Sequence, residues 1–152
     1  MIERLYSRPD RGVQIERDRV CVVADCGIEG DRNFGQSDEP GRNITFIKAE
    51  EIEAFFREQQ RRCDLSLTHR NVITRGVRLN DLVGAEFSAG GVRFRGVELC
   101  EPCLHLGKAL ATPAMSAAMV VKRLLHRGGL RAHALSSGEI AAGDRIERLL
   151  TQ

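Results

Sequence analysis

The strongest signal for chemistry in this sequence is a Cys-x-x-Cys motif at residues 100–103. Such a pair could supply half of a tetrahedral zinc site, in which four Cys or His side chains surround the metal. The other half is missing, because Cys21 and Cys26 are too far apart in the sequence for the usual second pair. The cysteine spacing therefore argues against structural zinc.

Two other roles for the motif remain open. Dithiol redox chemistry is one, since a proline between two cysteines also occurs in thioredoxin-like sites. That chemistry needs a helix that starts at the motif, whereas here a strand leads in and the next predicted helix cap is Thr112. The other role uses Cys103 alone, as an accessible thiolate that binds a soft metal or carries sulfur as a persulfide. Cys100 would then be a small buried hydrophobe.

Three polar loops carry glycine or arginine, at residues 27–32, 41–43 and 69–71. Glycine lets backbone N–H groups approach an anion, and arginine binds phosphate through its planar fork of donors. The first loop is not a dinucleotide-binding fingerprint, because it lacks the full glycine spacing. His105, two residues beyond Cys103, could orient the thiolate or polarise a substrate.

Short strands must position most of these residues, because the glycines fall mainly between short apolar runs. The apolar run Val20–Ala24 predicts a strand that is covered on both faces. Residues 87–94 predict a hairpin that turns at two glycines. In the second arm of this hairpin the apolar alternation slips by one residue at Gly96. This slip predicts a β-bulge that re-aims the strand toward residues 100–103.

Two helices and two closing strands complete the prediction. Helical spacing of apolar residues indicates a helix over Ala49–Arg62, and a second helix is expected from a Thr112 cap to Gly128. Arg131–Leu135 and Arg145–Leu150 predict two strands joined by the loop 136–139. The second helix is expected to pack a stripe of side chains into the core, namely Met115, Ala118, Met119 and Leu125.

Length and charge exclude some classes of protein. A chain of 152 residues is expected to form one domain, residues 1–152. The 23 Lys and Arg nearly balance the 21 Asp and Glu, so the net charge predicts neither nucleic acid nor membrane as a partner. The N-terminus lacks the apolar core of a signal peptide, and five cysteines form an odd set that argues against a disulfide framework. We therefore expect a cytoplasmic protein with reduced thiols.

Six motifs, taken in order, resemble the MOSC family, which is named after the C-terminal domain of molybdenum cofactor sulfurase. The resemblance runs from Ser7 to Ile146. Its motifs are Gly27-x-x-Gly30-Asp31-Arg32, Arg70-Asn71-Val72, Leu79–Gly84, Pro102-Cys103, Gly129–Ala132 and Gly138-x-Ile140-x-x-Gly143-Asp144. It implies a mainly β fold, a closed or partly closed β-barrel of the pyruvate-kinase β-barrel type with two or three peripheral helices.

The resemblance also implies a cofactor and a reaction. The cofactor is the molybdenum cofactor (Mo-molybdopterin), and Cys103 matches the catalytic cysteine that ligates molybdenum in related proteins. The implied reaction is the reduction of small N-hydroxylated compounds, with electrons from a separate donor protein. The alternative is a sulfur carrier, or a carrier of the cofactor, that works with a pyridoxal-phosphate cysteine desulfurase. From these loops and motifs, the residues expected to bind the cofactor are Arg32, Arg42, Asn43, Arg70, Asn71, Asn80, Asp81 and Arg131.

Overall fold

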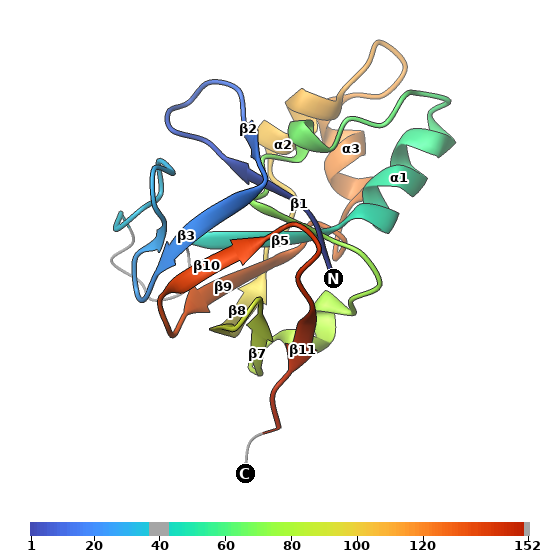
Figure 1. The fold of residues 1–152 in the computed structure, drawn as a ribbon. Coiled ribbons are helices and arrows are strands. Elements are labelled where there is room, and N and C mark those ends of the chain that lie inside the picture. The colour runs from blue at the N-terminus through green and yellow to red at the C-terminus, as the bar shows by residue number, and fades with distance from the viewer. Residues whose placement is uncertain (37–42, 151–152) are drawn as a thin grey trace.

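A strongly curled sheet forms most of the protein in the computed structural model, which describes residues 1–36 and 43–150 (Figure 1). The strands of this sheet follow the order β11-β7-β8-β9-β5-β6-β1-β2. In chain order they are β1 (Ile2–Ser7), β2 (Ile15–Arg17), β5 (Ile44–Lys48), β6 (Val72–Thr74), β7 (Glu86–Ala89), β8 (Val92–Leu99), β9 (Leu130–Ala134) and β11 (Ile146–Arg148). The sheet curls into half of a barrel, which confirms the predicted mainly β, partly closed fold.

A smaller sheet, in the order β10-β3-β4, covers the open side of the half-barrel. Its strands are β3 (Arg19–Val23), β4 (Gly27–Ile28) and β10 (Gly138–Ala141). The backbone of Ile2 ties the first strand to the segment after β10, because it donates to the Asp144 carbonyl and accepts from the Gly143 N–H, both at 2.8 Å. In the large sheet, β5 pairs in parallel with β6 and antiparallel with β9.

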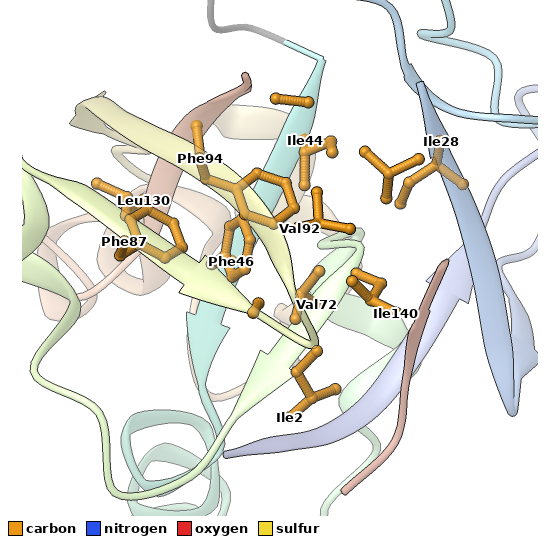
Figure 2. Close-up of a cluster of buried hydrophobic side chains, with 14 of the residues drawn as sticks. Ile2, Ile28, Ile44, Phe46, Val72, Phe87, Val92, Phe94, Leu130 and Ile140 are labelled. Carbon is orange, nitrogen blue, oxygen red and sulfur yellow. The ribbon is translucent and has the colours of Figure 1, made fainter. Parts of the chain in front are cut away.

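The inner face of the half-barrel is filled by apolar side chains. Phe46, Phe87 and Phe94 are fully buried, and their rings pack 5.4 to 5.5 Å apart between centroids. Figure 2 shows these rings and the other core side chains directed toward one another, with Ile28 and Ile140 reaching in from the small sheet. Successive side chains of a strand point to opposite faces, so the neighbours of these residues must face outward.

Helices cover the outer face, where Ile47 and Ile73 join a second apolar cluster. The helices are α1 (Ala49–Glu58), α2 (Leu104–Leu110) and α3 (Ala117–Arg123), with 3₁₀ helices η1 (Leu65–Thr68) and η2 (Leu79–Leu82). Helix α1 confirms the first predicted helix, although it ends before Arg62. It has 10 residues, far fewer than the roughly 20 apolar residues needed to cross a bilayer. In the part of the chain that the structure describes, no helix meets that requirement.

Both special features predicted around β8 are confirmed. Gly90 and Gly91 connect β7 to β8 with φ of 55° and 83°, a conformation that glycine adopts without strain. The pairing of β8 with β9 shifts register between Gly96 and Glu98. This bulge lies where the apolar alternation of the sequence slips.

The second predicted helix begins and faces differently from the prediction. Thr112 caps no helix, because its backbone and that of Met115 bond to each other in a turn. The N-cap is Ser116, whose hydroxyl accepts a hydrogen bond from the Met119 N–H. The helix therefore starts later in the chain than predicted, and different residues face the core. Val120 and Leu124 fill the core in place of the predicted stripe. Of that stripe only Met115 is buried, since the other members are exposed: Ala118, Met119 and Leu125.

Two predictions about strands are wrong as well. The run Val20–Ala24 is covered on one face only, because β3 belongs to the small sheet and leaves Cys21 exposed. The two predicted closing strands do not follow each other directly, since β10 lies between them in the chain. β9 pairs with β8 and β5, whereas β11 pairs with β7. Local apolar patterns cannot reveal these long-range pairings.

Candidate functional site

Cys103 lies exposed at the start of helix α2, a helix that the sequence did not predict. The bulge that precedes it requires glycine, because a Cβ at Gly96 would lie 2.0 Å from the Leu82 carbonyl oxygen. Beyond the strand, Cys100 is 3% exposed and donates its backbone N–H to the Gly129 carbonyl at 2.7 Å. This confirms Cys100 as a buried hydrophobe. The motif thus presents one thiol to solvent and buries the other.

Arg70 holds the loop that carries the motif. Its guanidinium is buried and donates to three backbone carbonyls, those of Gly128 (2.9 Å), Cys100 (3.3 Å) and Thr68 (3.4 Å). Gly128 fits closely beneath the same loop, because a Cβ there would lie 2.2 Å from the Cys100 carbonyl oxygen. Arg70 therefore positions the segment leading to Cys103. That it also binds the cofactor stays a prediction.

Asn71 is the centre of a buried polar network on the outer face of the sheet. Its Oδ1 accepts from the backbone N–H and the hydroxyl of Thr45, both at 3.1 Å. Its Nδ2 donates to the Tyr6 carbonyl (3.3 Å) and to Oδ2 of Asp31 (3.1 Å). The same Asp31 oxygen accepts the backbone N–H of Arg8. These bonds use all the donors and acceptors of the amide, so Asn71 joins β1, β5 and the loop of Arg32 rather than offering a free group to a ligand.

His69 lies next to His105 of α2 and close to several arginines. It adopts the left-handed conformation (φ 55°), and its ring lies 5.0 Å from the His105 ring between centroids. Burial lowers the pKa of His69 to about 4, and the charges of Arg8, His105, Arg70 and Arg32 add to this effect. The ring is therefore neutral at pH 7. Its Nδ1 is buried and has no hydrogen-bond partner in the described part of the protein.

Arg8 and Arg32 supply the positive charge of a cluster that also contains His69 and His105. We call these four residues the cationic cluster, and its two arginines favour a bound anion. Burial lowers the pKa of Arg8, and the nearby charge of Arg32 lowers it further. Positive groups that repel one another gain free energy when an anion binds between them. The cluster reaches the thiol through His105, which follows Cys103 by two residues in α2. Thiol and cations together can hold a ligand that carries both a soft metal centre and a phosphate.

Comparison with protein families shows which family the chain belongs to. A sequence model of the MOSC domain matches residues 31–147, a range that includes Arg32, Arg70 and Cys103. The chain belongs to the MOSC domain family. That family is associated with the molybdenum cofactor. No curated protein sequence matches the chain.

Solved structures confirm the MOSC fold. YuaD from Bacillus subtilis superposes with a TM-score of 0.85 at 21% identity, over 99% of this chain and 96% of that one. YiiM from Geobacillus stearothermophilus gives 0.74 at 15% identity, over 99% and 75% of the two chains. YiiM from Escherichia coli gives 0.70 at 16% identity, over 98% and 69%. At these identities the similarity establishes the fold alone.

Arg131 and Asn43 of this MOSC domain, two other predicted cofactor-binding residues, make contacts outside the cationic cluster. Arg131 stands beside Thr45 on the outer face of the sheet, with its Nε 3.7 Å from Oε1 of Glu98. Asn43 is buried and donates to a backbone carbonyl in the turn between β3 and β4, while its Oδ1 finds no partner among the described residues. Arg42 lies outside the described residues.

Asn80 and Asp81 line a separate cavity of 190 Å³ near η2. Asn80 donates to the His126 carbonyl at 3.1 Å, and Asp81 pairs with Arg78 at 2.8 Å. Cys103 is not among the residues that line this cavity, which are Lys48, Glu51, Arg78, Leu79, Asn80, Asp81, His126, Arg127 and Gly129. Asn80 is linked to the cysteine motif through His126, whose backbone N–H donates to Glu101 at 2.9 Å. That Asn80 and Asp81 bind the cofactor stays a prediction.

Two members of the cationic cluster were not predicted as site residues. His69 lies in a loop that was predicted to bind an anion through its arginine. The sequence does not indicate the left-handed conformation of His69. Arg8 follows the first strand as an ordinary charged residue, and no local pattern marks it. Only the fold brings these residues to His105, because they are far apart in the chain.

Proposed function

We propose that this MOSC domain binds the molybdenum cofactor, with Cys103 as the molybdenum ligand, and reduces small N-hydroxylated compounds. One observation carries the proposal: the exposed thiol of Cys103 lies two residues before His105, whose ring contacts His69 of the cationic cluster. A thiolate suits a metal that is already bound by sulfur, and arginines suit the phosphate of the pterin.

The residues present fit such a group. The Nδ1 of His69 is a buried polar atom that has no hydrogen-bond partner among residues 1–36 and 43–150, and such a group costs free energy until a ligand satisfies it. Arg8 and Arg32 are the cations that would meet the phosphate. His69 stays neutral at pH 7, so its ring can donate or accept a hydrogen bond to the ligand without adding charge. Arg70 would keep the Cys100–Cys103 loop in place while the ligand binds.

The proposed reaction is a two-electron reduction of the substrate. The N–O bond of a hydroxylamine breaks, two electrons and two protons are consumed, and an amine and water are released. When bound, the cofactor supplies the metal centre that passes on the two electrons. A separate donor protein supplies the electrons. In this proposal His105, two residues after Cys103 in the sequence, would orient a substrate or hold a proton for the leaving hydroxyl.

Metal and pterin content tests the proposal. Protein produced in a host that makes the cofactor should carry molybdenum and pterin, and Cys103→Ser should lose the molybdenum while keeping its fold. Cys21→Ser is the matched control, because Cys21 is also exposed but lies on β3. The control should keep the metal. Metal-free wild-type protein from that host, or full molybdenum content in Cys103→Ser, would contradict the proposal.

A sulfur carrier is the second candidate, and the burial of Cys100 favours it. The Cys103 thiolate would attack the outer sulfur of a persulfide on a pyridoxal-phosphate cysteine desulfurase. A new S–S bond forms on Cys103, and the cysteine of the desulfurase leaves as its thiolate. Because Cys100 is buried, it cannot readily resolve this persulfide into a disulfide. Intact mass after incubation with desulfurase and cysteine should rise by one sulfur atom at Cys103, and an unchanged mass would exclude this role.

A further inference from the structure

One long segment of the chain is free of acidic residues. Asp and Glu make up 21 of the 152 residues, yet none occurs between Glu101 and Glu139. The same segment carries Lys108, Lys122, Arg123, Arg127 and Arg131. The nearly neutral chain is therefore locally basic, and local charge steers a charged partner more than net charge does.

This segment forms α2 and α3, which pack closely against each other. Gly107 of α2 allows the approach, because a Cβ there would lie 2.5 Å from the Ala117 carbonyl oxygen. Leu104 and Lys108 are exposed on α2 at a spacing of four residues, which places them on the same side of the helix. Met119 and Lys122 are exposed on α3 in the same way, opposite the buried Val120. We call these four exposed residues the α2–α3 face.

The α2–α3 face combines apolar surface with uncompensated positive charge. Leu104 is 60% exposed and Met119 is 53% exposed, both high values for large apolar side chains. Neither Lys108 nor Lys122 forms an ion pair with any residue that the structure describes. On α1, Glu58 pairs with Arg123 and Glu51 pairs with Arg127 (3.3 and 3.5 Å). Those carboxylates are thus already neutralised.

The position of the face indicates its partner. Leu104 follows Cys103 directly, so a protein that covers the face comes within one residue of the thiol. We infer that the α2–α3 face is the docking surface for a small acidic electron-transfer protein, an inference that rests on the proposed reductase function. Exposed apolar residues with a charged border suit a brief electron-transfer complex, whose interface is small and whose encounter is steered by charge.

Calorimetric titration with a reduced acidic flavodoxin tests the docking surface on protein isolated from a cofactor-competent host. The test variant is Lys108→Glu with Lys122→Glu. The matched control is Arg145→Glu with Arg148→Glu, in or next to β11, a strand that lies at the opposite end of the protein from α2 and α3 (Figure 1). At low salt we expect the test variant to bind about tenfold more weakly, and the control less than about twofold. Higher salt should remove most of this difference.

Rates with two donors separate this inference from the proposed function. Reduced methyl viologen needs no docking surface, so its rate reports the reductase chemistry itself. The ratio of flavodoxin-driven to viologen-driven rate should fall about tenfold in the test variant. If no compound is reduced with viologen, the proposed function fails while calorimetry still tests docking. Equal flavodoxin affinity of wild type and test variant, or no binding, would overturn the inference. Tighter lysine-dependent binding to phosphatidylglycerol vesicles or to poly(U) would also overturn it.

Discussion

The two faces of the curled sheet use the same strands for different purposes. On β5, β6 and β9 the inner face carries Phe46, Val72 and Leu130, all fully buried among apolar neighbours. The outer face of these strands carries the polar residues Thr45, Asn71 and Arg131. Burial on the inner face is non-directional and stabilises the whole fold. Hydrogen bonds on the outer face are directional and fix the position of a few groups.

We expect substitutions on the inner face to cause the largest loss of stability and the smallest change in the geometry around Cys103. Phe46→Ala should lower the free energy of unfolding by about 3–5 kcal/mol, because it opens a cavity beside Phe87 and Phe94. Urea denaturation measures this loss, and the rate at which a thiol reagent modifies native Cys103 should stay within about twofold of wild type. A loss below about 1 kcal/mol would mean that the core repacks and that the inner face is less rigid than it looks.

Gly128→Ala should affect both stability and site. The new methyl group would meet the Cys100 carbonyl oxygen at 2.2 Å, so the motif loop must move. We expect a loss of about 2–3 kcal/mol and an altered rate of Cys103 modification. Gly12→Ala is the control, since its Cβ would meet only the flexible Asp10 side chain. An unchanged Cys103 rate in Gly128→Ala would show that the loop does not depend on this contact.

Arg70→Met tests the outer face directly. Methionine keeps the bulk but leaves the carbonyls of Gly128 and Cys100 without their donors, which should cost about 1–3 kcal/mol. Arg131→Met serves as the control, because its contact with Glu98 is long and partly exposed; it should change stability by less than about 0.5 kcal/mol. Urea denaturation of both variants measures the difference. Equal losses would mean that Arg70 is an ordinary surface charge.

The smallest expected effect is the contribution of His69 to the pH dependence of stability. Folding lowers the pKa of His69 from 6.5 to about 4, so the unfolded chain binds the proton more readily. Its contribution to stability is therefore complete above pH 6.5 and is lost as the pH falls toward 4. Between pH 7 and pH 5, wild type should lose about 1 kcal/mol more than His69→Gln in denaturant titrations. Parallel losses would show that the ring is better solvated than the structure indicates.

The inner face was predictable because its signals are local. Alternating apolar residues and two glycines mark the hairpin, and the slip at Gly96 marks the bulge. Helix α2 escaped prediction since its N-cap, Cys103, makes no capping bond and Gly107 weakens helix propensity. That glycine is needed for contact with α3, which is a tertiary requirement. A local pattern cannot anticipate it.

The candidate site was predictable only in part. The sequence identifies Cys103 as the accessible thiol of the Cys-x-x-Cys motif, and its exposure is as predicted. The contact of His69 with His105 joins a loop and a helix that are far apart in the chain. The structural role of Arg70 and Asn71 depends on partners from five other segments. Hydrophobic periodicity carries no information about such polar networks.

The tie between Ile2 and the backbone of residues 143 and 144 has a consequence for synthesis. The first strand cannot complete its contacts until nearly the whole chain has left the ribosome, and β5 must likewise wait for β9. Such a high contact order predicts slow folding, with apolar strand edges open to other nascent chains in the meantime. Closure of the sheet would therefore wait for residues 143 and 144 rather than proceed strand by strand.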